Sequence, residues 1–153
     1  MSELTPAYSR LVEQARGLLS GQSHLIANAA NLSALIFHEL PDLNWVGFYF
    51  LEGNALVVGP FQGKPACVQI PLGRGVCGTA AASRETQRVA DVHAFEGHIA
   101  CDAASESEIV VPLIQGDRLI GVLDIDSPLR GRFSPQDQAG IEALAQIYID
   151  SLS

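Results

Sequence analysis

The spacing of apolar residues predicts amphipathic helices at both ends of the chain. Residues 4–20 repeat apolar side chains at helical intervals, and Thr5 and Pro6 suit an N-cap and a first turn. A second helix is expected at about residues 23–39, before Pro41 ends it. Ser134 and Pro135 predict the start of a final helix. The expected apolar faces are Tyr8, Leu11, Val12, Ala15, Leu18 and Leu19 in the first helix, and Ile141, Leu144, Tyr148 and Leu152 in the last.

The middle of the chain has runs of β-branched and aromatic residues separated by turns, a pattern typical of strands. Strands are expected at residues 45–51, 55–59, 67–70, 86–92, 109–114 and 118–125. A glycine-rich loop and a short helix are expected at 73–82, and a long loop at 93–107. The connections among the first three strands are too short for parallel crossovers, and 115–117 predicts a hairpin. The order predicts an α+β domain, an antiparallel sheet of about six strands with helices packed on it.

Composition narrows the class of protein. The 153 residues are 48% hydrophobic and 17% charged, which fits one domain with a real core and excludes disorder. The formal net charge of −8 argues against binding to nucleic acid or to an anionic membrane. The sequence has neither an apolar run of ~18 residues nor a signal-like N-terminus, so we expect a cytoplasmic protein.

Three cysteines, Cys67, Cys77 and Cys101, are the first candidates for chemistry. They lie 10 and 24 residues apart, which disfavours a thioredoxin-type motif and a zinc ribbon. In a reducing compartment they should be free at rest and pair only transiently. Cys77 is expected at a helix start, where a thiol pKa can be lowered, and Cys101 has His98 and Asp102 beside it. Cys67 alone fits a small buried hydrophobe.

A metal site is not expected. His93, His98, Cys101 and Asp102 could in principle hold zinc, but their spacing matches no common motif, and structural zinc prefers cysteine pairs.

Carboxylates form the next candidate group. Asp124 and Asp126 are two residues apart on a predicted strand and therefore share a face, and Glu108 precedes the neighbouring strand. Like charges and burial raise a carboxyl pKa, so one of these groups could hold a proton near neutral pH. Alternatively, the pair caps a turn before Ser127 and Pro128, and composition leaves both interpretations open.

Trp45 and Tyr49 also share a strand face and could wall an apolar pocket or contact a cation through their rings, whereas Phe48 fits an ordinary core position. The glycine-rich stretch at 73–78 lacks the Gly-Lys-Ser/Thr ending of a phosphate loop.

Several separated blocks between Asn44 and Phe133, with all three cysteines in place, closely resemble the free methionine-(R)-sulfoxide reductases, a catalytic branch of the GAF-domain fold. One departure is Glu96, where many members have proline. The matching blocks are Asn44–Tyr49, Gly59–Cys67, Gly73–Ala80, Asp91–His93, Gly97–Asp102, Ser107–Leu113 and Gly121–Ser127.

The resemblance implies one GAF domain over residues 1–153, with N-terminal helices in 1–40, a catalytic core in 44–133 and a C-terminal helix in 134–153. It implies reduction of free L-methionine (R)-S-oxide to L-methionine by thiol chemistry, with thioredoxin as reductant and no metal or organic cofactor. A homodimer through the terminal helices is also compatible with it. The implied roles are nucleophile for Cys101, resolving cysteine for Cys67, auxiliary resolving cysteine for Cys77, substrate contacts for Glu108, Asp124 and Asp126, and pocket walls for Trp45 and Tyr49.

The alternative is a non-catalytic GAF module that senses a small ligand or redox state. Such a module normally sits beside an output domain, for which 153 residues leave no room, and it needs no set of three cysteines. A zinc-binding or purely interacting protein is less compatible with the cysteine spacing.

Overall fold

The structure is a computed structural model that describes residues 3–99 and 104–153. Within these residues the chain forms four α-helices, one short 3₁₀ helix and six strands. The elements are α1 (Pro6–Leu19), α2 (Leu25–Glu39), β1 (Trp45–Glu52), β2 (Ala55–Gly63), β3 (Gln69–Pro71), α3 (Gly75–Ser83), β4 (Gln87–Val89), η1 (Val92–Ala94), β5 (Ser107–Gln115), β6 (Arg118–Ser127) and α4 (Pro135–Ser151).

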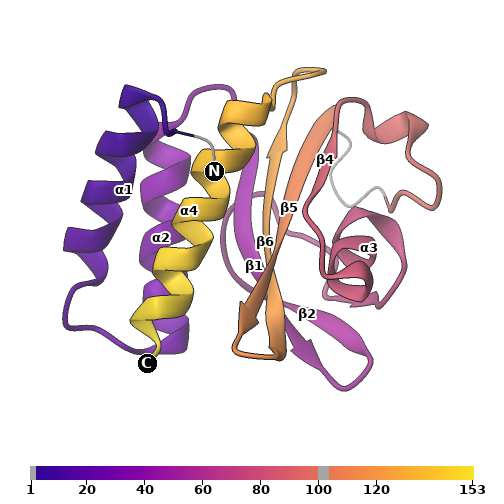
Figure 1. The fold of residues 1–153 in the computed structure, drawn as a ribbon. Helices are drawn as coiled ribbons and strands as arrows, with labels where there is room; N and C mark the ends of the chain where they lie inside the picture. The colour runs from indigo at the N-terminus through magenta and orange to yellow at the C-terminus, as the bar shows by residue number, and fades with distance from the viewer. Residues whose placement is uncertain (1–2, 100–103) are drawn as a thin grey trace.

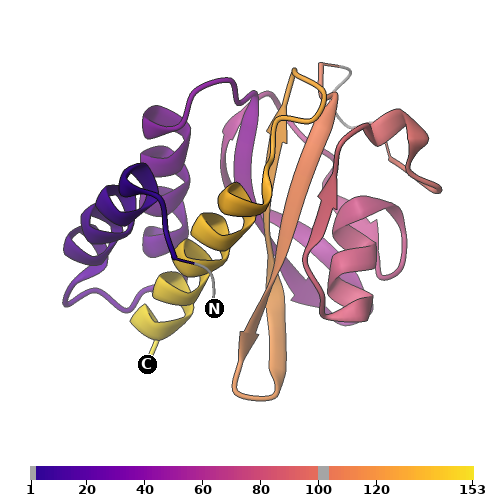
Figure 2. The same cartoon turned by 45° about the horizontal axis from the view of Figure 1, so that its top comes forward.

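The six strands form one sheet in the order β3-β2-β1-β6-β5-β4, and every neighbouring pair is antiparallel. The predicted α+β class and the six-stranded antiparallel sheet are therefore confirmed. Helices α1, α2 and α4 lie on one side of the sheet and α3 on the other (Figures 1 and 2). The molecule thus has a three-helix layer, a sheet, and a smaller layer of α3 and loops.

Strand alternation divides the apolar residues between these two sides. Val46 and Phe48 of β1 and Leu123 of β6 face the three-helix layer and belong to its core cluster. The Phe48 ring packs on Tyr148 of α4, with 4.6 Å between ring centroids. On the other side, Trp45 and Tyr49 of β1 pack with α3 in a second cluster. The central strands are therefore buried on both faces.

Helix caps expected from local sequence are present. The Thr5 side chain accepts from the Tyr8 N–H at the start of α1, and Ser134 and Asp137 form a capping box at the start of α4. Asp137 also accepts a 2.7 Å hydrogen bond from the Tyr8 hydroxyl and pairs with Arg132 at 3.3 Å. One carboxylate therefore caps α4 and joins it to α1.

Several expected details are wrong. Leu18, expected on the apolar face of α1, is 40% exposed. Leu19 holds the last buried position of that helix, and its neighbour Leu18 projects outward. The expected strand at 67–70 begins only at Gln69, so Cys67 lies in an irregular segment after β2. The expected strand at 86–92 ends at Val89, because the Asp91 side chain accepts from the His93 N–H and starts η1.

Among the described residues, no helix is both long enough and apolar enough to cross a membrane.

A glycine-to-alanine pair tests the contact between α1 and α4. A Cβ at Gly140 of α4 would lie 2.1 Å from a ring atom of Tyr8, whereas a Cβ at Gly17 of α1 meets nothing within 4 Å. We expect Gly140→Ala to lose ~1–3 kcal/mol by overpacking. We expect Gly17→Ala to gain up to ~1 kcal/mol through helix propensity. Urea unfolding of both variants measures the difference, and a stabilised Gly140→Ala would contradict this packing.

Candidate active site

A cavity lies on the α3 side of the sheet, where four strands, α3 and three connecting segments meet. Aromatic walls come from β1, and acidic side chains come from β5 and β6. Ala66 closes it from the segment after β2, and Ile99 and Ser105 close it from the long loop. Its lining therefore combines an apolar wall with a strongly acidic floor.

Strand register brings the acidic residues together. Glu108 on β5 pairs directly with Asp126 on β6, and Asp124 lies two residues along the same strand. Because alternate residues share a face, all three carboxyl groups project to the α3 side. Glu108 and Asp124 are 8% and 5% exposed, and Asp126 is half-buried. The turn-capping interpretation of Asp124 and Asp126 is wrong, since both lie within β6 and line the cavity.

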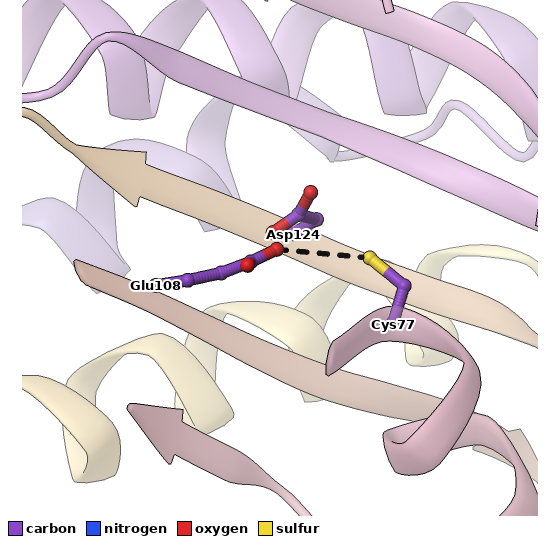
Figure 3. A group of neighbouring side chains, drawn as sticks. All are labelled: Cys77, Glu108 and Asp124. Carbon is purple, nitrogen blue, oxygen red and sulfur yellow. Dashed lines mark hydrogen bonds between the residues drawn. The ribbon is translucent and has the colours of Figure 1, made fainter. Parts of the chain in front are cut away.

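The thiol of Cys77 completes this cluster. Cys77 stands in the first turn of α3, and its Sγ lies 3.9 Å from Oε2 of Glu108 (Figure 3). One atom from each of Cys77, Glu108 and Asp124 lies within 4.8 Å of the others. Cys77 is a free cysteine and 4% exposed. We refer to these three residues as the thiol–carboxyl trio.

Burial controls the protonation of this cluster. Burial raises the pKa of Glu108 and of Asp124. The charge of Asp124 raises the Glu108 pKa further, and the charge of Asp126 does the same for Asp124. The pKa of Cys77 is raised by burial first and then by the surrounding carboxylates. The expectation of a lowered Cys77 pKa is therefore wrong, because burial and, after it, the three neighbouring acids outweigh the N-terminus of one short helix. The cluster favours neutral acids at rest.

One oxygen of the cluster stands out. Oδ1 of Asp124 is buried and has no hydrogen-bond partner among residues 3–99 and 104–153. A buried polar atom without a partner costs free energy of folding, so a hydrogen-bond donor or a cation that enters the cavity can bind this oxygen favourably.

The aromatic wall is held rigidly. The Trp45 ring stacks on Tyr49 and Phe61, with centroid distances of 5.7 and 5.1 Å. Its indole N–H donates to the Lys64 carbonyl at 3.1 Å. Gly47 makes room for this stack, because a Cβ there would lie 2.6 Å from the Trp45 ring. The wall therefore presents fixed apolar ring surface beside the acids.

The other two predicted cysteines differ in what the structure describes. Cys67 is half-buried in the segment that carries Ala66 to the cavity, and it packs beside the second core cluster. Cys67 is disulfide-bonded, so the expectation that it is free at rest is wrong for this structure. Cys101 and its neighbour Asp102 lie outside the described residues.

The histidines do not assemble with the trio. His98 lines the cavity, and its pKa is lowered by partial burial and by His93. His93 instead contacts Asp91 at 3.2 Å and Glu106 at 4.0 Å. Two members of the zinc set considered from sequence, Cys101 and Asp102, lie outside the described residues, so that set stays a hypothesis. The metal-competent group within the described residues is the thiol–carboxyl trio.

Sequence reasoning missed other lining residues. Arg74 was only part of a glycine-rich block, yet its side chain brings a positive charge to the cavity. Ser105 is buried and accepts a 3.1 Å hydrogen bond from the Asn44 side chain. Nothing in its local sequence signals this position, since it depends on how the long loop returns to the sheet.

Comparison with known proteins adds independent evidence. Residues 17–149 match the family model of the GAF domain. Free methionine-R-sulfoxide reductase of Escherichia coli (strain K12) is 55% identical over 140 residues, which cover 92% of this chain and 85% of that protein. The structure of fRMsr of Staphylococcus aureus in complex with substrate has 52% identity and a TM-score of 0.92, and covers 99% of this chain and 100% of that chain. The structure of free methionine-R-sulfoxide reductase from Neisseria meningitidis, also in complex with its substrate, has 40% identity and a TM-score of 0.92. The match covers 99% of this chain and 93% of that chain.

The raised carboxyl pKa values predict a stability change with a definite sign. An acid with a raised pKa binds its proton more tightly in the folded state, so stability is lost as pH rises from about 4 through the raised value. We therefore expect the free energy of unfolding of Asp124→Asn at pH 8 to exceed that of wild type by about 1 kcal/mol or more. For a domain of this size, each kcal/mol corresponds to a rise in Tm of ~2–4 °C. The advantage should shrink toward pH 5.

Thermal unfolding of the reduced protein across this pH range measures the effect. Asp117→Asn, at an exposed hairpin position, is the matched control and should show little change. An Asp124→Asn variant less stable than wild type at pH 8 would contradict the prediction, because it would show that the Asp124 carboxylate has a net stabilising role in the folded protein.

Proposed function

The chain belongs to the GAF domain family and, within it, to the free methionine-R-sulfoxide reductases. We propose that it reduces free L-methionine (R)-S-oxide to L-methionine with its cysteine thiols. The observation that carries the proposal is the cavity in which an aromatic wall faces clustered carboxyl groups. The relatives named for this activity extend over nearly the whole chain.

The acidic floor suits a free amino acid. Free methionine sulfoxide carries an ammonium group, whereas the same residue within a peptide has a neutral amide. Glu108 and Asp124 are buried and Asp126 is half-buried beside them. An ionised member of this group offers the ammonium a negative charge that would otherwise be costly to keep unpaired. Arg74 offers a cation for the substrate carboxylate, and Trp45 and Tyr49 offer ring surface for the methyl and thioether groups.

The same acids supply a proton. Reduction needs the sulfoxide oxygen to gain protons as a thiolate attacks the sulfur. A carboxyl group in this cluster with a pKa raised by burial can remain protonated near neutral pH and donate to that oxygen. One acid then binds the ammonium as an anion while another acts as the proton donor, and the arrangement leaves open which acid has which role.

Reduction and regeneration take three thiol steps. The Cys101 thiolate attacks the sulfoxide sulfur, the oxygen passes to Cys101 as sulfenic acid, and methionine leaves with its sulfur reduced by two electrons. The thiol of Cys67 then condenses with the sulfenic acid, releasing water and forming a disulfide. Thioredoxin, a dithiol reductant of the cytoplasm, reduces that disulfide by exchange and is itself oxidised.

Two structural facts support these cysteine roles. Ile99 and Ser105, which flank the segment that contains Cys101, both line the cavity. Ala66, next to Cys67, lines it from the opposite loop. The described neighbours of both cysteines in the sequence therefore line one cavity. Cys77 is buried in α3 beside Glu108, and we assign it the role of auxiliary thiol.

The terminal helices support a homodimer as part of this proposal. Leu18 of α1 and Ile26 of α2 are 40% and 46% exposed, so these helices offer apolar surface to a second copy. Sedimentation velocity distinguishes the dimer from the monomer.

A coupled assay tests the activity. Reduced protein, thioredoxin, thioredoxin reductase and NADPH are mixed with free methionine sulfoxide resolved into its two epimers. NADPH consumption with the R epimer and none with the S epimer is expected. No consumption with either, from folded and fully reduced protein, would favour the ligand-sensing GAF module instead.

Removal of the nucleophile separates an enzyme from a sensor. We expect Cys101→Ser to lower turnover by at least about 10³-fold, since no other thiol takes over the first attack. Binding of free methionine, measured by calorimetry, should stay within a few-fold of wild type and serves as the control for folding. Wild-type turnover in this variant would overturn the assignment of Cys101.

The resolving cysteine is tested by the fate of oxidised Cys101. We expect Cys67→Ser to turn over poorly with thioredoxin and to accumulate Cys101 sulfenic acid, because the buried Cys77 thiol condenses slowly. Mass spectrometry after one equivalent of substrate measures this species. A Cys77–Cys101 disulfide formed at the full rate would assign the resolving role to Cys77.

A further inference from the structure

The thiol–carboxyl trio has the composition of a metal site. Cys77 comes from α3, Glu108 from β5 and Asp124 from β6, and Figure 3 shows their ends converging between helix and sheet. A cluster built on three packed elements is more rigid than one built on loops. From this convergence we propose that the trio binds a thiophilic divalent cation of the zinc class, and that this cation inhibits the protein by occupying the cavity's acidic floor.

The spacing fits such an ion with small side-chain movements. Bonds of ~2.0–2.3 Å in a tetrahedron place ligand atoms roughly 3.3–3.7 Å apart. The Cys77 Sγ and Glu108 Oε2 are 3.9 Å apart, and all three ligand atoms lie within 4.8 Å of one another. Side-chain rotations that move the ligand atoms by a few tenths of an ångström to about one ångström bring them to these separations.

The donor types select the kind of ion. Magnesium and calcium take six or more oxygen ligands, so a site with one sulfur and two carboxylates suits them poorly. Thiolate together with carboxylate suits Zn²⁺, Cd²⁺ and the spectroscopic substitute Co²⁺. Three protein ligands leave a fourth position for water on the cavity side.

An independent observation points to the same ligand. Oδ1 of Asp124 is buried, lacks a hydrogen-bond partner within the described part of the chain, and belongs to a residue that lines the cavity. A bound cation supplies the positive partner for this oxygen. The half-buried Asp126 adds a further negative charge beside the ion.

Binding is a simple exchange without oxidation. The metal–sulfur bond forms as the Cys77 thiol releases its proton to water, and no electrons are transferred. The ion then holds Glu108 and Asp124, two of the carboxyl groups assigned above to the substrate ammonium. The inhibition rests on that proposed function, whereas the binding itself does not.

Cobalt titration tests the binding directly. The double variant Cys67→Ser/Cys101→Ser leaves Cys77 as the single thiol of the chain. We expect one equivalent of Co²⁺ to give a near-ultraviolet sulfur-to-cobalt band and strong visible bands of a tetrahedral site, both removed by Zn²⁺. Adding Cys77→Ser should abolish the sulfur band and weaken binding at least tenfold, and Asp124→Asn should also weaken it. Glu106→Gln, outside the trio, is the matched control and should bind as the parent does.

Each result decides a separate claim. Absence of a sulfur band from the folded double variant, or a band that survives Cys77→Ser, overturns the metal site. A band that depends on Cys77 but is unaffected by Asp124→Asn overturns the trio as its ligand set. If the site forms as proposed, free methionine sulfoxide should raise the apparent Kd for Co²⁺ several-fold. Binding that ignores the substrate supports the metal site but overturns inhibition and the substrate placement.

Discussion

Burying Glu108, Asp124 and Asp126 together is the constraint around which the functional side of this molecule is organised. Antiparallel register sets the carboxyl groups beside one another, and α3 and the loops shield them from water. Burial and mutual repulsion raise the pKa of Glu108 and Asp124, so the cluster favours partners that are cationic or that accept a proton. Substrate ammonium, a sulfoxide oxygen and a thiophilic metal ion each satisfy part of that requirement.

Packing in the rest of the molecule offsets the free-energy cost of burying these acids. The three-helix layer buries the opposite face of β1, β5 and β6, with Phe48 packed on Tyr148, and fixes the strands that carry the acids. Stacking of Trp45 on Tyr49 and Phe61 holds the apolar wall in place. Stability is thus concentrated on one side of the sheet, which allows the other side to keep a locally unfavourable charge arrangement.

Sequence patterns predicted much of this arrangement because it depends on local rules. Helical spacing, the Ser134 cap and strand alternation gave the helices, the sheet and the shared face of Asp124 and Asp126. What failed depends on tertiary packing. The pKa of Cys77 is raised by burial in the folded chain and by acids that lie 31 or more residues away in sequence. Ser105 reaches the cavity only through the path of a long loop.

A comparison of substrates that differ only at their ends tests the role of the buried carboxyl groups. The kcat/KM of free methionine (R)-sulfoxide would be measured against that of its N-acetyl derivative and its carboxamide in the same assay. Because the acidic floor is assigned to the ammonium group, blocking the amine should lower kcat/KM by at least about 10²-fold, a loss expected for an unpaired buried charge, and blocking the carboxylate should cost less. Equal activity on the amine-blocked substrate would contradict the role assigned to the buried carboxyl groups.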